Sequence, residues 1–147
     1  MPDLHQVAIL LVEDDPGHAR LIVKNLRRAN ITNDIVTVED GQEAVDYLFA
    51  EGEHAGTKRR SPMLVLLDLN LPVLDGYQVL KRMKADERTR RIPVIILTTT
   101  DDTREVARCY DLGCNVYITK PVDYQQFSEA IRKIGLFLSV VTIPNGE

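Results

Sequence analysis

Acidic, hydroxyl and ammonium side chains follow the apolar runs of this sequence. Glu13, Asp14 and Asp15 come after the run at 7–12, Asp68 after 63–67, Thr98 after 92–97 and Lys120 after 115–119. Carboxylates held close together repel one another unless one is protonated or a cation neutralises them. Hard oxygen ligands favour Mg²⁺, or the similar Mn²⁺. The pattern predicts a divalent-cation site with a hydroxyl and an ammonium nearby, provided that the fold brings these residues together.

Each of these residues also has an ordinary structural interpretation. Asp15 is a natural helix N-cap, Thr98 suits a turn, and Lys120 precedes a proline that would stop a strand. The combination is more specific than any single residue, because each residue ends a different apolar run. Zinc is not expected, since no His or Cys ligand is predicted near the acidic residues.

The three histidines are not assigned to this site. His5 and His54 are expected to lie outside the acidic cluster. His18 falls inside the first predicted helix, and we interpret it as a surface or packing residue.

The apolar runs alternate with segments of helical periodicity, which indicates strands alternating with helices. Strands are predicted at 7–12, 34–38, 63–68, 92–97 and 115–119. Helices are predicted to begin at Asp15, at Asp40, at Asp75-Gly76, at Asp101 or Asp102, and near Asp123. The fourth helix carries Val106, Ala107, Tyr110 and Leu112, and the last carries Phe127, Ala130, Ile131 and Ile134. The polar segment 51–61 is predicted to be a long loop.

Strands that alternate with helices imply right-handed βαβ units and a parallel sheet. Five such units in 147 residues predict an open, doubly wound α/β sheet with strand order 2-1-3-4-5, and they exclude a closed eight-unit barrel. In this order the carboxyl ends of the first and third strands flank the switch point where sites form. Glu13, Asp14 and Asp68 are therefore predicted to meet at one edge of the sheet.

Length and charge restrict the remaining possibilities. The chain is predicted to be a single domain, residues 1–147, with an apolar C-terminal extension at about 136–147 and no room for a DNA-binding output domain. Its formal net charge of −4 argues against nucleic acid as a partner. Its apolar runs are too short for a membrane helix or a signal peptide. We therefore expect a cytoplasmic protein with reduced thiols at Cys109 and Cys114 and no membrane partner.

Four segments in this order resemble a response-regulator receiver domain of two-component signalling. They are ILLVEDDP at 9–16, LDLNLPVLDG at 67–76, PVIILT at 93–98 and YITKP at 117–121, and the resemblance covers about residues 7–135. It implies the flavodoxin-like receiver fold. It also implies a phosphorelay function, in which a sensor histidine kinase donates a phosphoryl group to an aspartate and the protein-interaction surface then switches.

The resemblance assigns a role to each site residue. Asp68 matches the phosphoacceptor, Glu13 and Asp14 match the acidic pair that binds Mg²⁺, and the backbone carbonyl of Asn70 matches a further metal ligand. Thr98 and Lys120 match the residues that hold the phosphoryl oxygens. Thr98 and the aromatic Tyr117 match the two switch residues. Such a protein catalyses only its own phosphorylation and dephosphorylation.

Several positions depart from the common receiver pattern. Glu13 stands where Asp is more frequent, Thr99 where a smaller residue is usual, and Val122 where Phe is frequent. The long loop and the apolar tail resemble small single-domain regulators paired with phytochrome photoreceptor kinases, so a phytochrome is an expected partner. The tail residues also predict a homodimer formed through the C-terminal region: Leu136, Phe137, Leu138, Val140, Val141 and Ile143.

Three alternatives share parts of this pattern. A phosphatase of the haloacid dehalogenase type also uses an aspartate nucleophile and Mg²⁺, but it needs a second Asp where this chain has Asn70. A degenerate receiver would act only as a protein-binding module, although all the key positions are present. A flavin-binding module has a similar topology, but an acidic edge would repel the flavin phosphate.

Overall fold

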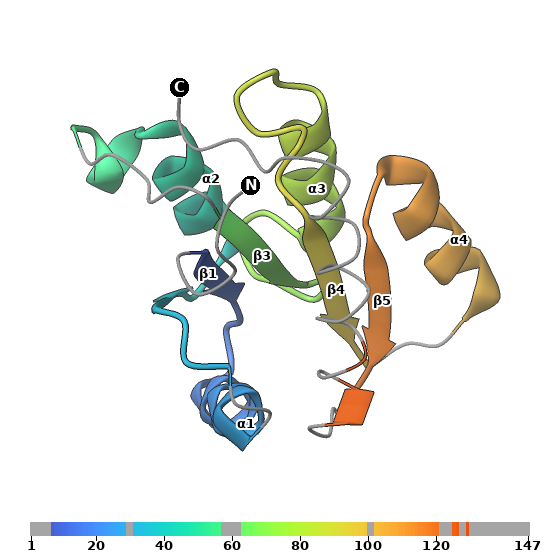
Figure 1. Ribbon diagram of the computed structural model, residues 1–147. Coiled ribbons are helices and arrows are strands. Elements are labelled where there is room, and N and C mark those ends of the chain that lie inside the picture. The colour runs from blue at the N-terminus through green and yellow to red at the C-terminus, as the bar shows by residue number, and fades with distance from the viewer. Residues whose placement is uncertain are drawn as a thin grey trace.

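Five parallel strands form the centre of the molecule in the computed structural model, which describes residues 7–28, 31–56, 63–99, 102–120, 125, 126 and 129. The strands are β1 (Ala8–Val12), β2 (Ile35–Val38), β3 (Met63–Asp68), β4 (Val94–Thr98) and β5 (Val116–Thr119). Their order across the sheet is β2-β1-β3-β4-β5 (Figure 1). The predicted fold class and strand order are confirmed, and the strand ends differ from the predicted ones by at most two residues.

The central strands are covered on both faces. Every residue of β1, β3 and β4 is buried, which explains why their sequences are continuous apolar runs without alternation. In the parallel register Val12 of β1 pairs with Leu67, and Asp68 of β3 pairs with Leu97. The residues that end these strands therefore emerge at the same edge of the sheet.

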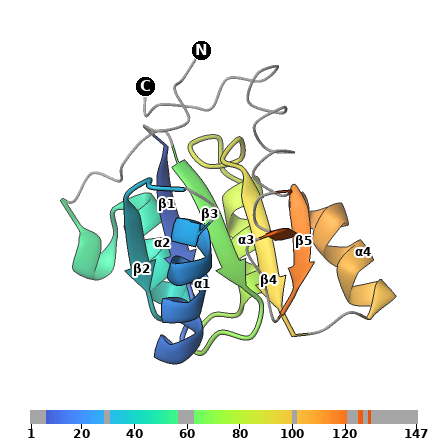
Figure 2. The same ribbon diagram turned by 60° about the horizontal axis from the view of Figure 1, so that its bottom comes forward.

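Helices lie on both faces of the sheet (Figure 2). α1 (Pro16–Arg28) covers one face, and α2 (Gly41–Phe49), α3 (Gly76–Lys84) and α4 (Thr103–Leu112) cover the other. Ile22 and Leu26 of α1 belong to an apolar cluster with one set of strand side chains. Leu48 of α2 and Val79 of α3 belong to a larger cluster with the opposite set.

Aspartates begin the helices, as predicted. Asp15 Oδ1 accepts hydrogen bonds from the backbone N–H groups of Gly17 at 2.8 Å and His18 at 3.0 Å. The N-caps of α2, α3 and α4 are Asp40, Asp75 and Asp102, and Asp75 forms a reciprocal capping box with Gln78. Because α1 and α3 start close to the ends of β1 and β3, their caps fix the loops around the carboxyl edge.

The apolar residues of α4 are not the most buried residues of this helix. Cys109 is the buried residue of this helix, whereas Ala107 and Tyr110 are exposed and Val106 and Leu112 are half-buried. Leu112 packs against the core cluster that contains Cys109, and the helix also contacts α3, where the guanidinium carbon of Arg108 lies 3.9 Å from the ring centroid of Tyr77. This contact places a cation over an aromatic ring, which adds an electrostatic attraction to the apolar packing of the helix.

The structure describes two of the predicted segments only in part. Residues 52–54 of the segment predicted as a loop at 51–61 form a 3-10 helix, η2 (Gly52–His54), so the prediction of a loop is wrong for these three residues. Residues 57–62 lie outside the described residues. Gln125, Gln126 and Glu129 of the last predicted helix are helical. The core residues predicted for that helix and the extension at 136–147 lie outside the described residues. In the described part of the chain, the helices are too short or too polar to cross a membrane.

Candidate functional site

The ends of four strands are joined by hydrogen bonds at the carboxyl edge of the sheet. Lys120, directly after β5, donates through Nζ to Glu13 Oε1 and, at 3.0 Å, to Asp68 Oδ2. Its backbone N–H donates to the carbonyl oxygen of Thr98 at 2.6 Å. The structure therefore brings together Glu13, Asp68, Thr98 and Lys120, which are far apart in the sequence.

The ion pairs of this site are shielded from water. The exposed fraction of the side chain is 1% for Glu13, 7% for Asp68 and 10% for Lys120. Burial raises the pKa of the Glu13 carboxyl; the hydrogen bond from Lys120 opposes this rise and the nearby Asp68 reinforces it. Burial alone would lower the pKa of the Lys120 ammonium, but its hydrogen bonds to Glu13 and Asp68 raise it above the ordinary value. The ammonium therefore stays charged between the two acids.

Asp14 completes a group of three carboxylates. One oxygen atom from each of Glu13, Asp14 and Asp68 lies within 4.8 Å of the other two. Glu13 and Asp68 are buried and Asp14 is exposed, so the group faces solvent on the side of Asp14. Carboxylate oxygens so close together fit a hard divalent cation that keeps water on its open side, such as Mg²⁺ or Mn²⁺. Asn70 adjoins the group, since its backbone N–H donates to Asp68 Oδ1 at 3.1 Å.

Thr98 presents a buried hydroxyl at the same edge. The residue is fully buried, and its Oγ1 has no hydrogen-bond partner among the described residues. A buried hydroxyl without a partner is costly, so an oxygen of a ligand at this edge would satisfy it. Tyr117 is half-buried on β5, in register with Ile96, and its assignment as a switch residue stays a prediction.

These observations coincide with a match to a known family. The sequence model of the response regulator receiver domain matches residues 9–132 of the chain. The chain belongs to this family. The matched range includes every site residue of this receiver, from Glu13 to Lys120, and confirms the resemblance found in the sequence motifs.

Solved structures and a characterised relative place this receiver more closely. A receiver domain from Rhodospirillum rubrum is 55% identical, with a TM-score of 0.76 over 96% of this chain and 99% of that one. The phosphorylated cyanobacterial phytochrome response regulator RcpA is 42% identical, with a TM-score of 0.76 over 95% and 99% of the two chains. Response regulator Rcp1 of Synechocystis is 37% identical over 92% of both chains. The crystal structure of its Mn²⁺-bound form has a TM-score of 0.76, over 94% of this chain and 99% of that one.

His18 is exposed, as its interpretation as a surface residue predicts, but it also lies beside the site of the receiver, which was not predicted from the sequence. Its Nδ1 atom lies 3.5 Å from Lys120 Nζ and 3.8 Å from Glu13 Oε1, and its side chain is 51% exposed. The sequence holds a signal for this position, because Asp15 caps a helix that begins at the strand edge and His18 lies in its first turn. His54, in contrast, packs against the ring of Tyr47. His5 lies outside the described residues.

Proposed function

We propose that this receiver accepts a phosphoryl group on Asp68 from a phosphohistidine of a sensor histidine kinase. The observation that carries the proposal is the contact of one buried ammonium, Lys120, with both Asp68 and Glu13. Phosphoryl transfer asks a protein mainly for positioning and for neutralisation of charge. A strand-end carboxylate, an ammonium bound to it and the nearby Thr98 hydroxyl supply these, and membership of the receiver family supports the assignment.

In the proposed step a carboxylate oxygen of Asp68 forms a bond to phosphorus while the bond from phosphorus to the donor imidazole nitrogen breaks. The donor ring leaves as a neutral imidazole that keeps the proton on its other nitrogen, and the product is an acyl phosphate. The phosphorylated side chain carries a charge of about −1.5 to −2, where the free carboxylate carried −1, so the negative charge at the sheet edge increases. Lys120 and the Thr98 hydroxyl are the groups that meet this charge, and their movement toward it would change the neighbouring surface.

We propose that Glu13, Asp14 and Asp68, together with the backbone carbonyl of Asn70, hold the divalent cation. The Mn²⁺-bound structure of Rcp1 supports a cation of this class, Mg²⁺ or Mn²⁺, in the present receiver. Such a cation, when bound, neutralises charge on the phosphoryl oxygens. Because Glu13 is buried and bound to Lys120 while Asp14 is exposed, Asp14 is the stronger candidate for direct contact.

The kinase that we propose as donor is a phytochrome photoreceptor, because of the similarity to the phytochrome response regulator RcpA. The receiver acts on no substrate other than its own Asp68 in this proposal. A cytoplasmic location is consistent with the free, buried thiols of Cys109 and Cys114. Burial raises the pKa of these thiols to about 11 and about 12, so they stay protonated and unreactive at neutral pH.

We also propose one domain over residues 1–147, with the apolar extension at about 136–147 joining two copies in a homodimer. The support is the sequence of that extension, which would leave an apolar patch on a monomer. Light scattering on the full chain and on a chain that ends at Ile134 tests this association. A dimer that becomes a monomer on truncation is expected, and a full chain that is monomeric with and without phosphorylation would contradict it.

Transfer of label from a phosphorylated kinase tests the proposed function. Wild type and Asp75→Asn are expected to accept label in the presence of Mg²⁺, because Asp75 caps α3 and asparagine retains the cap. Asp68→Asn is nearly isosteric and is expected to accept none. A wild type that stays unlabelled would favour the degenerate receiver that only binds a partner. Full labelling of Asp68→Asn would place the acceptor elsewhere.

A further inference from the structure

Three side chains surround the ammonium of Lys120, and only two of them are carboxylates. Glu13 Oε1 and Asp68 Oδ2 accept from Nζ, and the third neighbour is His18 Nδ1 at 3.5 Å. An ammonium has three N–H donors and no acceptor, so these neighbours match its donors in number. The contact with His18 requires Nδ1 to be the unprotonated ring nitrogen, since an N–H there would point at a cation.

The opposite tautomer has no comparable partner in this geometry. A proton on Nδ1 would have Glu13 Oε1 as its nearest carboxylate oxygen, and the separation of 3.8 Å is too long for a hydrogen bond. Of the two tautomers, the one with its proton on Nε2 is therefore the one that the geometry favours.

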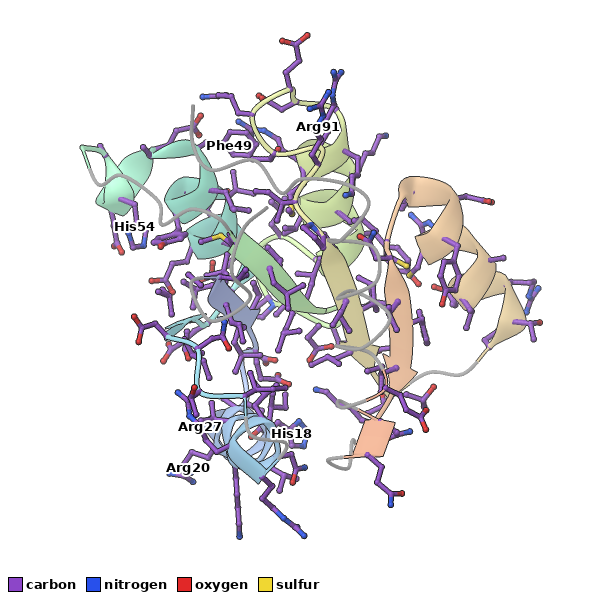
Figure 3. All side chains as sticks on the ribbon, viewed as in Figure 1. His18, Arg20, Arg27, Phe49, His54 and Arg91 are labelled. Atoms are coloured by element: carbon purple, nitrogen blue, oxygen red, sulfur yellow. The ribbon has the colours of Figure 1, made fainter. Side chains whose placement is uncertain are left out.

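The first turn of α1 fixes the position of His18. The backbone N–H of His18 donates to Asp15 Oδ1 at 3.0 Å, and that of Gly17 donates to the same oxygen at 2.8 Å. The cap holds the backbone of the turn, so the imidazole needs to fix only its own side-chain rotamer. In Figure 3, His18 and Arg20 leave α1 on opposite sides, and His18 is on the side of β5.

We propose that His18 is a positioning residue for Lys120, which keeps the ammonium in the site while the two carboxylates exchange partners. This inference rests on the proposed function. Glu13 and Asp68 are both proposed to help hold a cation, and Asp68 is also proposed to attack phosphorus, so each carboxylate has a second partner that competes with Lys120. His18 is not part of the group of possible cation ligands, which consists of Glu13, Asp14 and Asp68, so a cation there would not compete with Lys120 for the imidazole.

The consequence is a more localised ammonium. A lysine side chain is a flexible stem with a compact charge, and its position depends on the acceptors around it. Without the imidazole, Lys120 would follow whichever carboxylate remained free or turn to water. Phosphorylation would then be slower at saturating cation, because the charge that neutralises the phosphoryl group is in place for a smaller fraction of the time.

Nuclear magnetic resonance of the unphosphorylated protein, without added metal, tests the contact directly. We expect a long-range ¹H–¹⁵N spectrum to show the proton of His18 on Nε2. We also expect the Lys120 ammonium signal to be visible in wild type and in His18→Asn, whose Oδ1 takes the place of Nδ1, and to be lost through solvent exchange in His18→Leu. A proton on Nδ1, or an unchanged ammonium signal in His18→Leu, would overturn the proposal.

Phosphorylation by acetyl phosphate at saturating Mg²⁺ tests the consequence. His18→Leu is expected to react about fivefold more slowly, the effect of one net hydrogen bond, and His18→Asn to react at nearly the wild-type rate. His54→Leu, which removes an imidazole from η2, is the matched control and is expected to react as wild type does. Equal rates in wild type and His18→Leu, or equally slow His18→Asn and His18→Leu, would overturn the role. A wild type that acetyl phosphate does not modify would count against the proposed function instead, while the resonance experiment would still decide the contact.

Discussion

Gly76 is packed directly against the backbone of the proposed phosphoacceptor. It is the first residue of α3, and its N–H donates to the carbonyl oxygen of Leu69 at 3.0 Å. A Cβ atom at this position would overlap the carbonyl oxygen of Asp68 and would lie 2.6 Å from the Cα atom of Leu69. Because carbon atoms in contact lie about 3.5–4.0 Å apart, Gly76→Ala requires a backbone movement of about 1 Å at the end of β3.

We expect this movement to affect stability and phosphorylation by different amounts. Overpacking of this kind costs about 1–3 kcal/mol of the free energy of unfolding, so the variant should still fold. A misplacement of about 1 Å at a reacting group can cost about 100-fold in rate. Urea unfolding measures the first effect, and the rate of phosphorylation by acetyl phosphate at saturating Mg²⁺ measures the second.

Gly56→Ala is the matched control for this substitution. Gly56 has a φ of +83°, and a Cβ there would meet nothing within 4 Å. The alanine should cost about 1–2 kcal/mol through its left-handed backbone and leave the phosphorylation rate unchanged. If Gly76→Ala were phosphorylated at the wild-type rate, or if Gly56→Ala were slowed as much, the reasoning that links this contact to the acceptor would be wrong.

Three further predictions concern metal binding, backbone strain and pH. In a Mn²⁺ titration, Asp14→Ala is expected to lose most of the metal affinity and Glu13→Ala less of it, because Asp14 is exposed and Glu13 is bound to Lys120. A larger loss of affinity in Glu13→Ala than in Asp14→Ala would contradict these proposed roles. Val73 has a φ of +69°, within a turn in which the N–H of Leu74 donates to the carbonyl oxygen of Pro72. Because this backbone conformation is strained for valine, Val73→Gly should raise the free energy of unfolding in urea by about 1 kcal/mol, and a lower free energy of unfolding would refute the strain. The hydrogen bonds from Arg88 lower the pKa of Asp86 from its usual 3.8 to about 2. The stability that this pair contributes is therefore present above pH 3.8 and is lost as the pH falls toward 2. Titration by nuclear magnetic resonance should show the low pKa of Asp86 in wild type and a pKa closer to 3.8 in Arg88→Gln.

Much of the fold can be predicted because its signals are local. The continuous apolar runs of β1, β3 and β4 identify strands that are buried on both faces, and each is followed by a residue that must leave the sheet. The strand-end residues then share one edge because all five strands are parallel. Asp40 and Asp75 mark the starts of α2 and α3 for the same local reason, since a cap needs only its own turn.

The remaining features depend on contacts between distant segments. The buried residue of α4 is Cys109, and Arg108 of the same helix lies over the ring of Tyr77, so the apolar residues of α4 alone do not predict how this helix packs. The third acceptor of Lys120 is 102 residues away in the chain, and only the direction in which α1 leaves the sheet brings His18 to it. The close approach of Gly76 to the acceptor backbone likewise follows from how α3 folds back on β3.

Location of the phosphoryl group within the chain tests the central claim most directly. The receiver would be phosphorylated in the presence of Mg²⁺, the acyl phosphate reduced with borohydride to fix its position, and the peptides sequenced by mass spectrometry. We predict that the reduced residue is Asp68, in the peptide that contains residues 63–76. Modification at Asp14, Asp15 or any other carboxylate, with Asp68 intact, would contradict the assignment of Asp68 as the phosphoacceptor.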